Sequence, residues 1–150
     1  MVIDGVKVIP LRRIQDERGC IYHMMKATDE HFKQFGEIYF SSIYSEAIKG
    51  WHKHDIATLS YTAILGTIKL VIYDERQDSP TKGEIMELFI GENNYCLVQI
   101  PPGLWNGFKA IGGKTAIVAN CCSHPHGAFK SERLDPIRNH IPYDWDIKNE

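Results

Sequence analysis

The feature that most constrains the fold of this chain is the alternation of short apolar segments with turns built from glycine and proline. Segments rich in β-branched and aromatic residues occupy positions 6–10, 37–44, 58–65, 67–73, 85–90, 95–100 and 115–120. Turn signals separate them, among them Asp78-Ser79-Pro80, Pro101-Pro102-Gly103 and Gly112-Gly113. Many short strands at such spacing are typical of a β-sandwich or a β-barrel. We therefore predict an all-β fold in the form of a cupin or jelly-roll β-barrel.

Signals for helices and for domain boundaries are sparse. Residues 29–35 (DEHFKQF) fit two helical turns with Thr28 or Asp29 as the cap, so one or two short helices are expected. Gly66 separates two strand-like segments and predicts either a tight bend or a hairpin. No repeat, low-complexity tract or linker divides the 150 residues. A single domain over residues 1–150 is therefore expected.

Charge and cysteine usage narrow the class of protein. The formal net charge of -2 provides no broad cationic field, so nucleic acid is not an expected partner. No apolar run approaches the length of a membrane span and no signal peptide is recognisable, so a cytoplasmic protein without membrane association is expected. The four cysteines form no CxxC pair, which favours reduced thiols. A catalytic role for Cys121 or Cys122 is the alternative.

The histidine pair at positions 52 and 54 carries the most chemistry of any segment. On a strand, alternate side chains face the same side, so His52 and His54 both point into the barrel. Two inward histidines suggest a metal site. In metal-binding cupins a glutamate and a third histidine complete that site, and the matching positions here hold Leu59 and Asn106. We therefore expect no metal. A metal-dependent cupin enzyme using His52 and His54 remains an alternative.

A barrel that keeps inward histidines without a metal can use them for proton transfer. Imidazole has a pKa of about 6.5, so a neutral His52 can accept a proton at neutral pH. Such a base is usually oriented by a carboxylate, and Asp135, followed by Pro136, is the best candidate. An aspartate before a proline is also a common turn element, which is the alternative interpretation of Asp135.

Ordered segments along the chain form a further pattern. They are Asp16-Glu17-Arg18-Gly19, Lys49-Gly50-Trp51-His52, Asp74-Glu75-Arg76, Ser79-Pro80-Thr81-Lys82-Gly83, Ile100-Pro101-Pro102-Gly103, Gly107-Phe108, Asp135-Pro136 and Ile141-Pro142. In this order and spacing the chain resembles the dTDP-4-dehydrorhamnose 3,5-epimerase family, from about Gly5 to Trp145. The resemblance implies a cupin fold, a homodimer, and activity without a metal or a cofactor.

The resemblance also implies a reaction. Substrates of the family are nucleoside diphosphates that carry a deoxyhexose with a ketone at C4. A histidine base removes a proton at C3 or C5, and a tyrosine returns a proton on the other face. The family's histidine–aspartate dyad falls on His52 and Asp135. Its diphosphate contacts fall on Arg18, which would reach a neighbouring subunit's site, and on Lys49, where the family has arginine.

Four further positions of the family's site carry different residues in this chain. The lysine that stabilises the enolate falls at Leu59, and a histidine falls at Asn106. The catalytic tyrosine falls at Asn120, and a second tyrosine falls at His126. Losing the acid and the enolate cation costs transition-state stabilisation unless other groups replace them. Asn120 is kept as a candidate contact to the substrate.

Replacements for the missing groups are available along the chain. His54 and Asn106 can donate hydrogen bonds to the ketone oxygen, and His126 can act as the acid. By strand parity Tyr61 and Tyr73 are expected to face the barrel. Trp105, in the loop expected after Pro101-Pro102-Gly103, can stack on a sugar or a base.

The sequence therefore predicts a metal-independent epimerase of a nucleotide-linked 4-keto-deoxy sugar. In this hypothesis His52 removes a proton at C3, C5 or both, in deoxysugar or surface-polysaccharide biosynthesis. A non-catalytic nucleotide-sugar-binding cupin is the main alternative, and a metal-dependent cupin is the second. The residues do not identify the nucleotide or the sugar.

Overall fold

The chain folds into β-strands joined by turns and loops. The structure is a computed structural model that describes residues 2–149, and no helix occurs within that range. In chain order the strands are β1 (Lys7–Pro10), β2 (Arg13–Asp16), β3 (Gly19–Tyr22), β4 (Glu37–Ile43), β5 (Ile48–His54), β6 (Leu59–Leu65), β7 (Thr67–Tyr73), β8 (Ile85–Gly91), β9 (Cys96–Ile100), β10 (Trp105–Ile111), β11 (Ala116–Cys122) and β12 (Ser131–Arg133).

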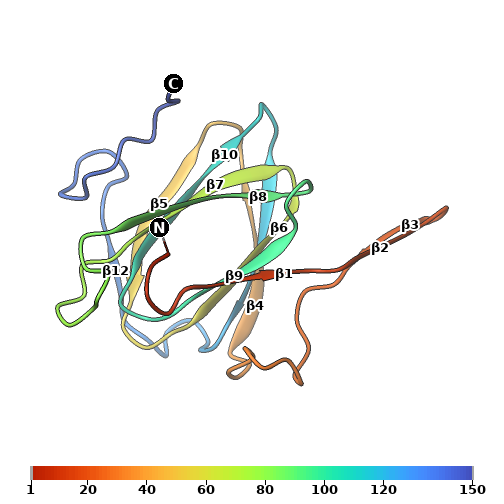
Figure 1. Ribbon diagram of the computed structural model, residues 1–150, viewed down its shortest axis with the longest axis horizontal. Coiled ribbons are helices and arrows are strands. Elements are labelled where there is room, and N and C mark those ends of the chain that lie inside the picture. Colours follow the sequence, from red (N-terminus) through yellow and green to blue (C-terminus); the bar gives the residue numbers. More distant parts are fainter. Residues whose placement is uncertain (1, 150) are drawn as a thin grey trace.

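Two five-stranded sheets face each other (Figure 1). The first has the order β1-β9-β6-β11-β4 and the second the order β12-β5-β10-β7-β8. Every pairing is antiparallel, and most neighbours in a sheet are far apart along the chain. β2 and β3 form a separate hairpin that extends away from the sheets (Figure 1). The predicted all-β jelly-roll or cupin fold is confirmed.

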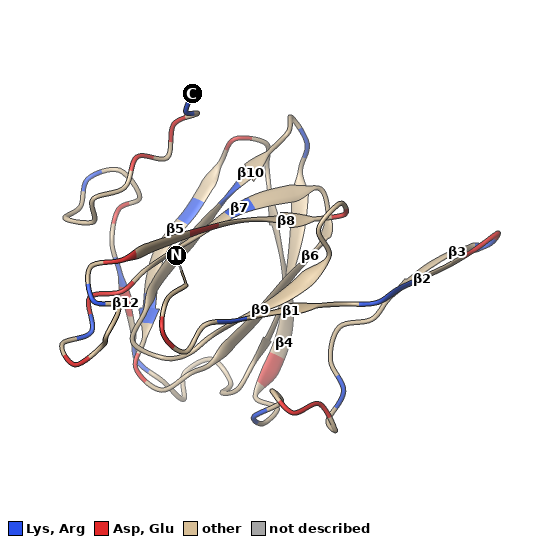
Figure 2. Cartoon of the chain, viewed as in Figure 1, with Lys and Arg blue, Asp and Glu red and all other residues tan. Residues whose placement is uncertain are grey.

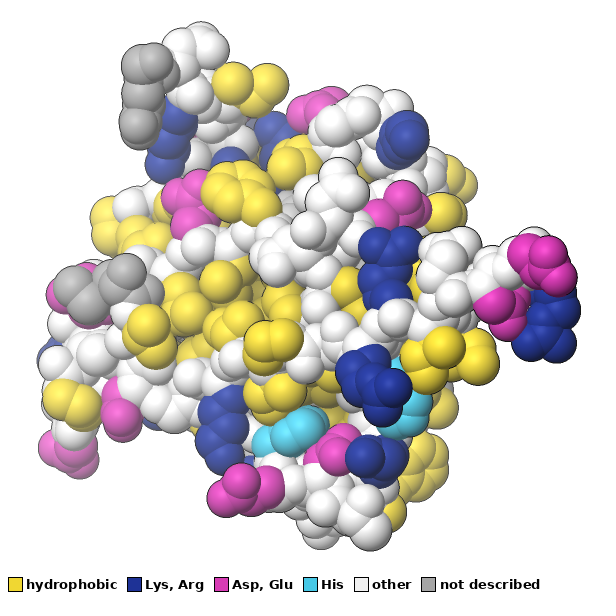
Figure 3. Space-filling model, turned by 45° about the vertical axis from the view of Figure 1, so that its right-hand side comes forward, with side chains coloured by type: hydrophobic (Ala, Val, Ile, Leu, Met, Phe, Trp, Pro, Cys, Tyr) yellow, Lys and Arg dark blue, Asp and Glu magenta, His cyan; other side chains and the backbone are white. Residues whose placement is uncertain are grey.

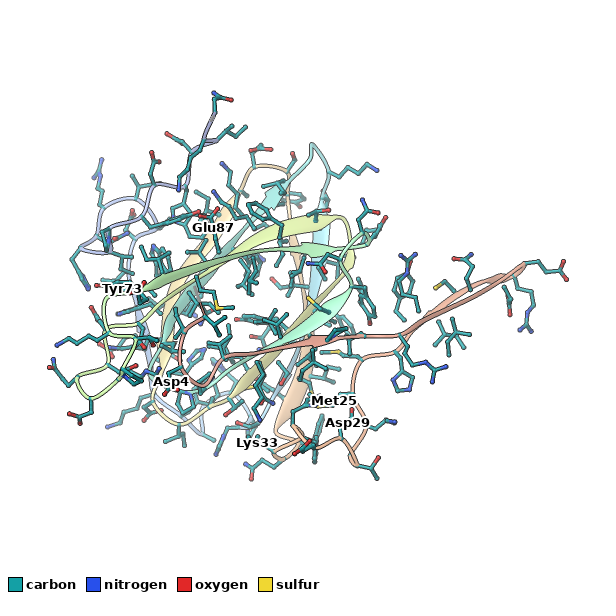
Figure 4. All side chains as sticks on the ribbon, in the orientation of Figure 1. Asp4, Met25, Asp29, Lys33, Tyr73 and Glu87 are labelled. Atoms are coloured by element: carbon teal, nitrogen blue, oxygen red, sulfur yellow. The ribbon has the colours of Figure 1, made fainter. Side chains whose placement is uncertain are left out.

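The main hydrophobic core fills the space between the sheets, because each strand places alternate side chains there. In β7, for example, Ile68, Leu70 and Ile72 are fully buried in this core. Val71 and Tyr73 alternate with them and pack on the outer face of the second sheet. Tyr73, which Figure 4 labels at one side of the molecule, therefore does not face the barrel as predicted.

Gly66 is the point where the chain passes from one sheet to the other. Because β6 belongs to the first sheet and β7 to the second, Gly66 makes a tight bend and not a hairpin. Its φ angle of 70° lies in the left-handed region that favours glycine. A Cβ atom at this position would lie 2.7 Å from the carbonyl oxygen of Thr115. The bend also explains why strand parity did not carry over from Tyr61 to Tyr73.

A second apolar cluster covers the outer face of the second sheet. It consists of Trp51, Val71, Trp105, Ile141 and Trp145. The ring centroids of Trp51 and Trp145 are 5.2 Å apart. Lys69 and Lys109 both donate to the carbonyl oxygen of Trp145, at 3.2 and 3.1 Å. The C-terminal segment is thereby fixed against β7 and β10.

Residues 27–31 form turns and residues 32–36 are irregular, in place of the helix predicted at 29–35. The amide of Phe32 donates to the carbonyl of Asp29, and the amide of Asp29 donates to the carbonyl of Lys26, each at 3.0 Å. The Asp29 carboxylate accepts from the Lys26 amide at 2.8 Å instead of capping the amides that follow it. A side chain that bonds to preceding backbone stabilises a turn and competes with a helix. Figure 4 labels Asp29 and Lys33 in this segment, which connects β3 to β4.

The strand prediction also missed some elements. Residues 105–111, expected as part of a loop, form β10 between β5 and β7. The hairpin strands β2 and β3 and the short β12 lie outside the predicted strands as well. Across the part of the chain that the structure describes, no helix has the length and hydropathy needed to cross a membrane.

Candidate functional site

A cavity of about 430 Å³ lies between the two sheets, and both sheets contribute to its walls. It is lined by Glu37, Tyr39, His52, His54, Leu59, Tyr61, Cys122, His126, Phe129, Ser131 and Arg133. A recess of about 90 Å³ shares part of this lining and adds Ser41, Lys49, Phe108, Val118 and Asn120. Tyr39, His52 and Tyr61 line both spaces. Most of the predicted site residues therefore meet in one place.

A larger depression of about 950 Å³ is lined mainly by charged side chains, among them Lys53, Arg76 and Glu132. These charges pair with protein groups. Lys53 lies 3.1 Å from the Glu132 carboxylate, and Arg76 lies 2.9 Å from that of Asp74. Because His52 does not line this depression, we assign the functional site to the smaller cavity between the sheets.

β5 supplies both histidines of the cavity. His52 and His54 line it, whereas the Nζ atom of Lys53 lies on the outer side, 4.8 Å from the centre of the Trp105 ring. The predicted inward orientation of the two histidines is confirmed. Nδ1 of His54 lies 2.8 Å from the hydroxyl oxygen of Ser131, so that ring is held in place. The imidazole nitrogens of His52 have no hydrogen-bond partner within residues 2–149.

The surroundings of His52 keep its imidazole neutral. Burial is the main cause that lowers the pKa of His52, and the nearby Arg133 and His54 contribute, so that the pKa lies at about 4. Burial is also the main cause that lowers the pKa of His54. At pH 7 His52 is therefore in the form that accepts a proton. Its low pKa makes it a weak base until an anion offsets the positive charge beside it.

A β-bulge brings Lys49 to the same side of β5 as His52. Asn106 of β10 pairs with His52, and Phe108 pairs with Lys49, so β5 has one more residue than β10 in this interval. The extra residue shifts the alternation of side chains along β5, so Lys49 and His52, three residues apart, face the same side of the sheet. The Nζ atom of Lys49 donates to the hydroxyl of Ser41 and to the carbonyl of Ser42, at 2.8 and 2.7 Å. The Lys49 ammonium is thereby fixed at the deep recess.

Arg133 is a site residue that the sequence interpretation missed. β12 pairs with β5 so that Arg133 lies directly opposite His52, and its side chain lines the cavity. No hydrogen bond or ion pair to protein groups involves this guanidinium within residues 2–149. An unpaired arginine at a cavity wall is suited to an anionic ligand. No local pattern in the sequence marks Arg133, because the pairing of β12 with β5 places it.

Tyr61 and Asn106 form a buried polar pair beneath the histidines. The Tyr61 hydroxyl donates to Oδ1 of Asn106 at 3.2 Å, and Nδ2 of Asn106 donates to the carbonyl of His52 at 3.2 Å. Burial raises the pKa of Tyr61 well above its ordinary value. Asn106 is 1% exposed and has both ends of its amide engaged, so it positions β5 and Tyr61.

A second amide and phenol, Asn120 and Tyr39, face His52 from the first sheet. The two residues are directly paired between β11 and β4, and Nδ2 of Asn120 donates to the Tyr39 hydroxyl at 2.9 Å. Sequence reasoning missed Tyr39. The signal was the alternation in 37–44, but the apolar Ile38 and Phe40 lie exposed on the outer side, so hydrophobicity does not show which face is inward.

The described residues provide little for a metal ion. Within residues 2–149, no group of three or more His, Cys, Asp or Glu side chains is arranged to hold one. Leu59 lines the same cavity as His52 and His54 and occupies the position where a cupin metal site has its glutamate. These residues do not fit the metal-dependent alternative.

Comparison with known proteins identifies the family. The family model described as dTDP-4-dehydrorhamnose 3,5-epimerase matches residues 1–149. The probable low-salt glycan biosynthesis epimerase Agl13 of Haloferax volcanii is 34% identical over 144 residues, which cover 95% of this chain and 89% of that protein. This chain belongs to the dTDP-4-dehydrorhamnose 3,5-epimerase family. The predicted family and enzyme class, a nucleotide-sugar epimerase, are confirmed.

Solved structures agree with this membership. A dTDP sugar isomerase from Desulfovibrio desulfuricans superposes with a TM-score of 0.92 at 39% identity, covering 95% of this chain and 92% of that one. The dTDP-6-deoxy-D-glucose-3,5-epimerase of Legionella pneumophila, solved with dTDP-4-keto-L-rhamnose, superposes with a TM-score of 0.83 at 22% identity, covering 100% and 83%. The second likeness shows the fold alone.

The His52–Asp135 pair that the family resemblance implies is not formed in this structure. Oδ1 of Asp135 accepts hydrogen bonds from the amides of Ile137 and Arg138, both at 2.8 Å. These bonds lower the pKa of Asp135, and the bond from the Arg138 amide has the larger effect. Asp135 is an exposed turn residue. This arrangement matches the alternative interpretation, a turn before Pro136. The catalytic role of Asp135 stays a prediction.

Two predicted contacts of the epimerase site lie away from the cavity. Arg18 is at the tip of the β2–β3 hairpin, where it pairs with Asp16 at 2.7 Å and its side chain is 87% exposed. Figure 2 shows this charged tip far from the sheets. Trp105 lies in the outer cluster, and its Nε1 donates to Glu75 at 2.6 Å. Strand alternation in β10 sends Asn106 inward and Trp105 outward, so the predicted stacking role of Trp105 is wrong.

Proposed function

We propose that this protein inverts the configuration at C3, C5 or both of a dTDP-linked 4-keto-deoxyhexose, with His52 as the base. The family description and the dTDP sugar isomerase of Desulfovibrio desulfuricans support this substrate class. The names of two curated relatives support a role in glycan biosynthesis. These are the Haloferax glycan epimerase and the spore coat polysaccharide biosynthesis protein SpsL of Bacillus subtilis, which is 34% identical over 111 residues, or 74% of each chain. The observation that carries the proposal is the neutral His52 imidazole in a cavity that also holds two phenols and unpaired cationic charge.

The reaction begins at the carbon next to the ketone. The C–H bond there is acidified by the carbonyl, and its electron pair moves toward the carbonyl oxygen as His52 takes the proton. His54 is suited to donate to the resulting enolate oxygen. When the Ser131 hydroxyl donates to Nδ1 of His54, the hydrogen resides on Nε2, and the ring becomes a neutral donor.

Two cations of the cavity are suited to the diphosphate. Lys49 is fixed at the recess by Ser41 and Ser42, and Arg133 stands beside His52 with no protein partner in the described residues. A bound diphosphate offsets the charge of Arg133, which is one cause of the low pKa of His52. We therefore infer that substrate binding strengthens the base at the moment it is needed.

Solvent exchange tests this proposal directly. In D₂O, with dTDP-4-keto-6-deoxyglucose as the probe, the wild-type protein should introduce deuterium at C3, C5 or both, as followed by ¹H NMR. The positions labelled identify the carbon that is epimerised. Exchange that persists after treatment with EDTA supports the metal-independent route. Binding of the probe without exchange would contradict an enzymatic role and favour the nucleotide-sugar-binding alternative.

We further propose a homodimer in which the β2–β3 hairpin reaches the partner's cavity. A two-stranded hairpin is marginal by itself in water, yet this one extends from the body with Ile14 and Ile21 exposed at 42% and 62%. Figure 3 shows the hairpin projecting with a charged tip and apolar side chains near its base. Packing against a second copy covers these residues and brings Arg18 to a diphosphate.

Subunit complementation tests the dimer. Arg18→Ala and His52→Ala variants are each expected to be impaired, and mixing them after partial unfolding should restore activity. One site of each hybrid dimer then has both residues, so recovery should reach about a quarter of the wild-type level. No recovery on mixing, or a monomer in light scattering, would contradict a shared site.

We also propose that the protein works in the cytoplasm. All four cysteines, Cys20, Cys96, Cys121 and Cys122, are free thiols in the structure. Burial raises the pKa of the Cys121 and Cys122 thiols, which disfavours the thiolate that a catalytic cysteine needs. Free thiols of this kind are typical of a reducing compartment. Fractionation of the source cells, followed by immunodetection, tests the location.

A further inference from the structure

The wall of the cavity that faces His52 is built by the first sheet and presents two phenols. Tyr39 comes from β4 and Tyr61 from β6, whereas His52 comes from β5 of the second sheet. A sugar ring held between the sheets therefore has an imidazole on one face and a phenol on the other. Inversion at a carbon needs this arrangement, because the proton must leave from one face and return to the opposite one.

The two phenols differ in whether their proton can be delivered. The hydroxyl of Tyr61 already donates its hydrogen bond to Oδ1 of Asn106, and Tyr61 is only 5% exposed. Tyr39 is 44% exposed, and its oxygen accepts a hydrogen bond from Nδ2 of Asn120. No acceptor engages the Tyr39 hydrogen within residues 2–149. Tyr39 is thus the phenol whose proton is free for a ligand.

The direction of the Asn120–Tyr39 bond is fixed by a third group. Oδ1 of Asn120 accepts from the backbone amide of Ser60 at 3.1 Å. That contact holds the oxygen of the side-chain amide toward β6 and leaves its NH₂ group facing Tyr39. Tyr39 therefore receives a hydrogen bond and cannot use Asn120 as its acceptor. A donor aimed at a phenol oxygen also stabilises the phenolate that remains after proton transfer.

The surroundings of Tyr39 both raise and lower the pKa of its phenol. Burial is the main cause that raises the pKa of Tyr39, with smaller contributions from Cys122 and Glu37, while the Asn120 hydrogen bond and Arg133 lower it. The net shift is upward, so Tyr39 holds its proton at neutral pH. Asn120 and Arg133 then favour its release during the reaction.

We propose that Tyr39 is the catalytic acid, which returns a proton to the substrate carbon on the face opposite His52, and that Asn120 is its positioning residue. This inference rests on the proposed epimerase function. Asn120 occupies the position at which the family resemblance leads one to expect a tyrosine. Because Tyr39 is directly opposite Asn120 across β4 and β11, the phenol is supplied from the neighbouring strand.

The proton balance of this step closes without any co-reactant. The C–H bond breaks, its electron pair forms the enolate, and His52 takes the proton. The enolate electron pair then takes the proton of Tyr39 and forms a new C–H bond on the other face, leaving a phenolate. His52 releases its proton to water and the phenolate takes one from water, which the partial exposure of Tyr39 allows.

The test separates deprotonation from inversion. In D₂O with dTDP-4-keto-6-deoxyglucose, Tyr39→Phe should still exchange the substrate proton, because His52 can return a deuteron to the same face. Formation of the inverted product should fall by at least about 100-fold. Asn120→Ala should move the alkaline limb of kcat/KM to higher pH, because the phenol loses a donor that lowers its pKa.

Tyr61→Phe and His126→Ala test the two other candidate acids of the cavity. Tyr61→Phe removes the other phenol, and His126→Ala removes an alternative acid at the cavity rim. Circular dichroism confirms that each variant is folded. Inversion by Tyr39→Phe at the wild-type rate, or exchange without inversion in His126→Ala instead, would overturn the assignment of Tyr39. Absence of exchange in the wild-type protein is a different result, since it overturns the proposed epimerase function itself.

Discussion

Trp51 and His52 are neighbours in β5, yet they face opposite sides of the second sheet and have opposite surroundings. Trp51 is 1% exposed and packs against Trp145 under the C-terminal segment. His52 is half-buried in the cavity, and its ring has no hydrogen-bond partner within residues 2–149. One strand therefore serves stability on its outer side and leaves the His52 ring without a partner on its inner side. Substitutions on the two sides should have separable effects.

The largest effect is expected on the outer side. Trp51→Ala removes a fully buried ring from the aromatic cluster and should lower the free energy of unfolding by about 3–5 kcal/mol. Chemical denaturation monitored by circular dichroism measures it. Tyr44→Ala is the matched control, because Tyr44 is 77% exposed and its loss should change stability by less than about 0.5 kcal/mol. Equal losses in the two variants would remove the distinction between the two sides.

A comparable loss is expected at the turn that follows β7. The fully buried carboxylate of Asp74 accepts hydrogen bonds from Arg76 and from the hydroxyl of Thr81, at 2.9 and 2.7 Å. Burial alone raises the pKa of Asp74, but these bonds outweigh it and hold the pKa far below its usual range. Asp74→Ala should cost about 3 kcal/mol at pH 7. Asp78→Ala, an exposed neighbour, should cost little.

The sign of the pH dependence follows from that depressed pKa. An aspartate whose pKa is lower in the folded state contributes its stability above its unfolded pKa of about 3.9 and loses it as the pH falls further. The difference between wild type and Asp74→Ala should therefore shrink as the pH is lowered below about 4. A difference that grows in acid would contradict this role of Asp74.

On the inner side, Arg133→Gln should affect binding and leave stability nearly unchanged. The variant loses a charge that faces the cavity, so KM for dTDP-4-keto-6-deoxyglucose should rise about tenfold, which corresponds to about 1.4 kcal/mol. Arg138→Gln is the control, since Arg138 is exposed in the turn after β12 and does not line the cavity. The same rise in both variants would indicate a general charge effect.

The smallest expected effect is a shift in pH dependence. Because the pKa of His52 is lowered to about 4, kcat/KM should stay near its maximum as the pH falls from 8 to about 5, and decline below that. An ordinary histidine would lose its base form near pH 6.5. A steady-state pH profile measures the acid limb, and a midpoint near 6.5 would show that the cavity does not perturb His52.

The fold was largely predictable because its signals are local. Segments such as 67–73 alternate apolar residues in a way that predicts a strand without knowledge of its neighbours. The prediction failed where tertiary contacts decide. Residues 105–111 contain Asn106 and Gly107 beside a proline–glycine turn, and they become a strand because β5 and β7 pair with them. The expected helix at 29–35 gave way to turns stabilised by the Asp29 carboxylate.

The site was predictable in part for the same reason. The inward orientation of His52 and His54 follows from strand parity within one segment. Arg133 and Tyr39 reach the cavity through register with β5 and β11, which involves residues about 80 positions away in both cases and cannot be inferred from local pattern. Asp135 was placed by resemblance, and the backbone amides after it bind its carboxylate instead.

The most direct test of the account is proton exchange by a matched pair of histidine variants. His52→Gln removes the inner imidazole, whereas His140→Gln removes an exposed histidine that pairs with Glu75 at 2.8 Å on the outer side. In D₂O, His52→Gln should lose exchange into the keto sugar by about 10²–10⁴-fold, and His140→Gln should match the wild type. Full exchange by His52→Gln would contradict the claim that His52, on the inner face of β5, is the base.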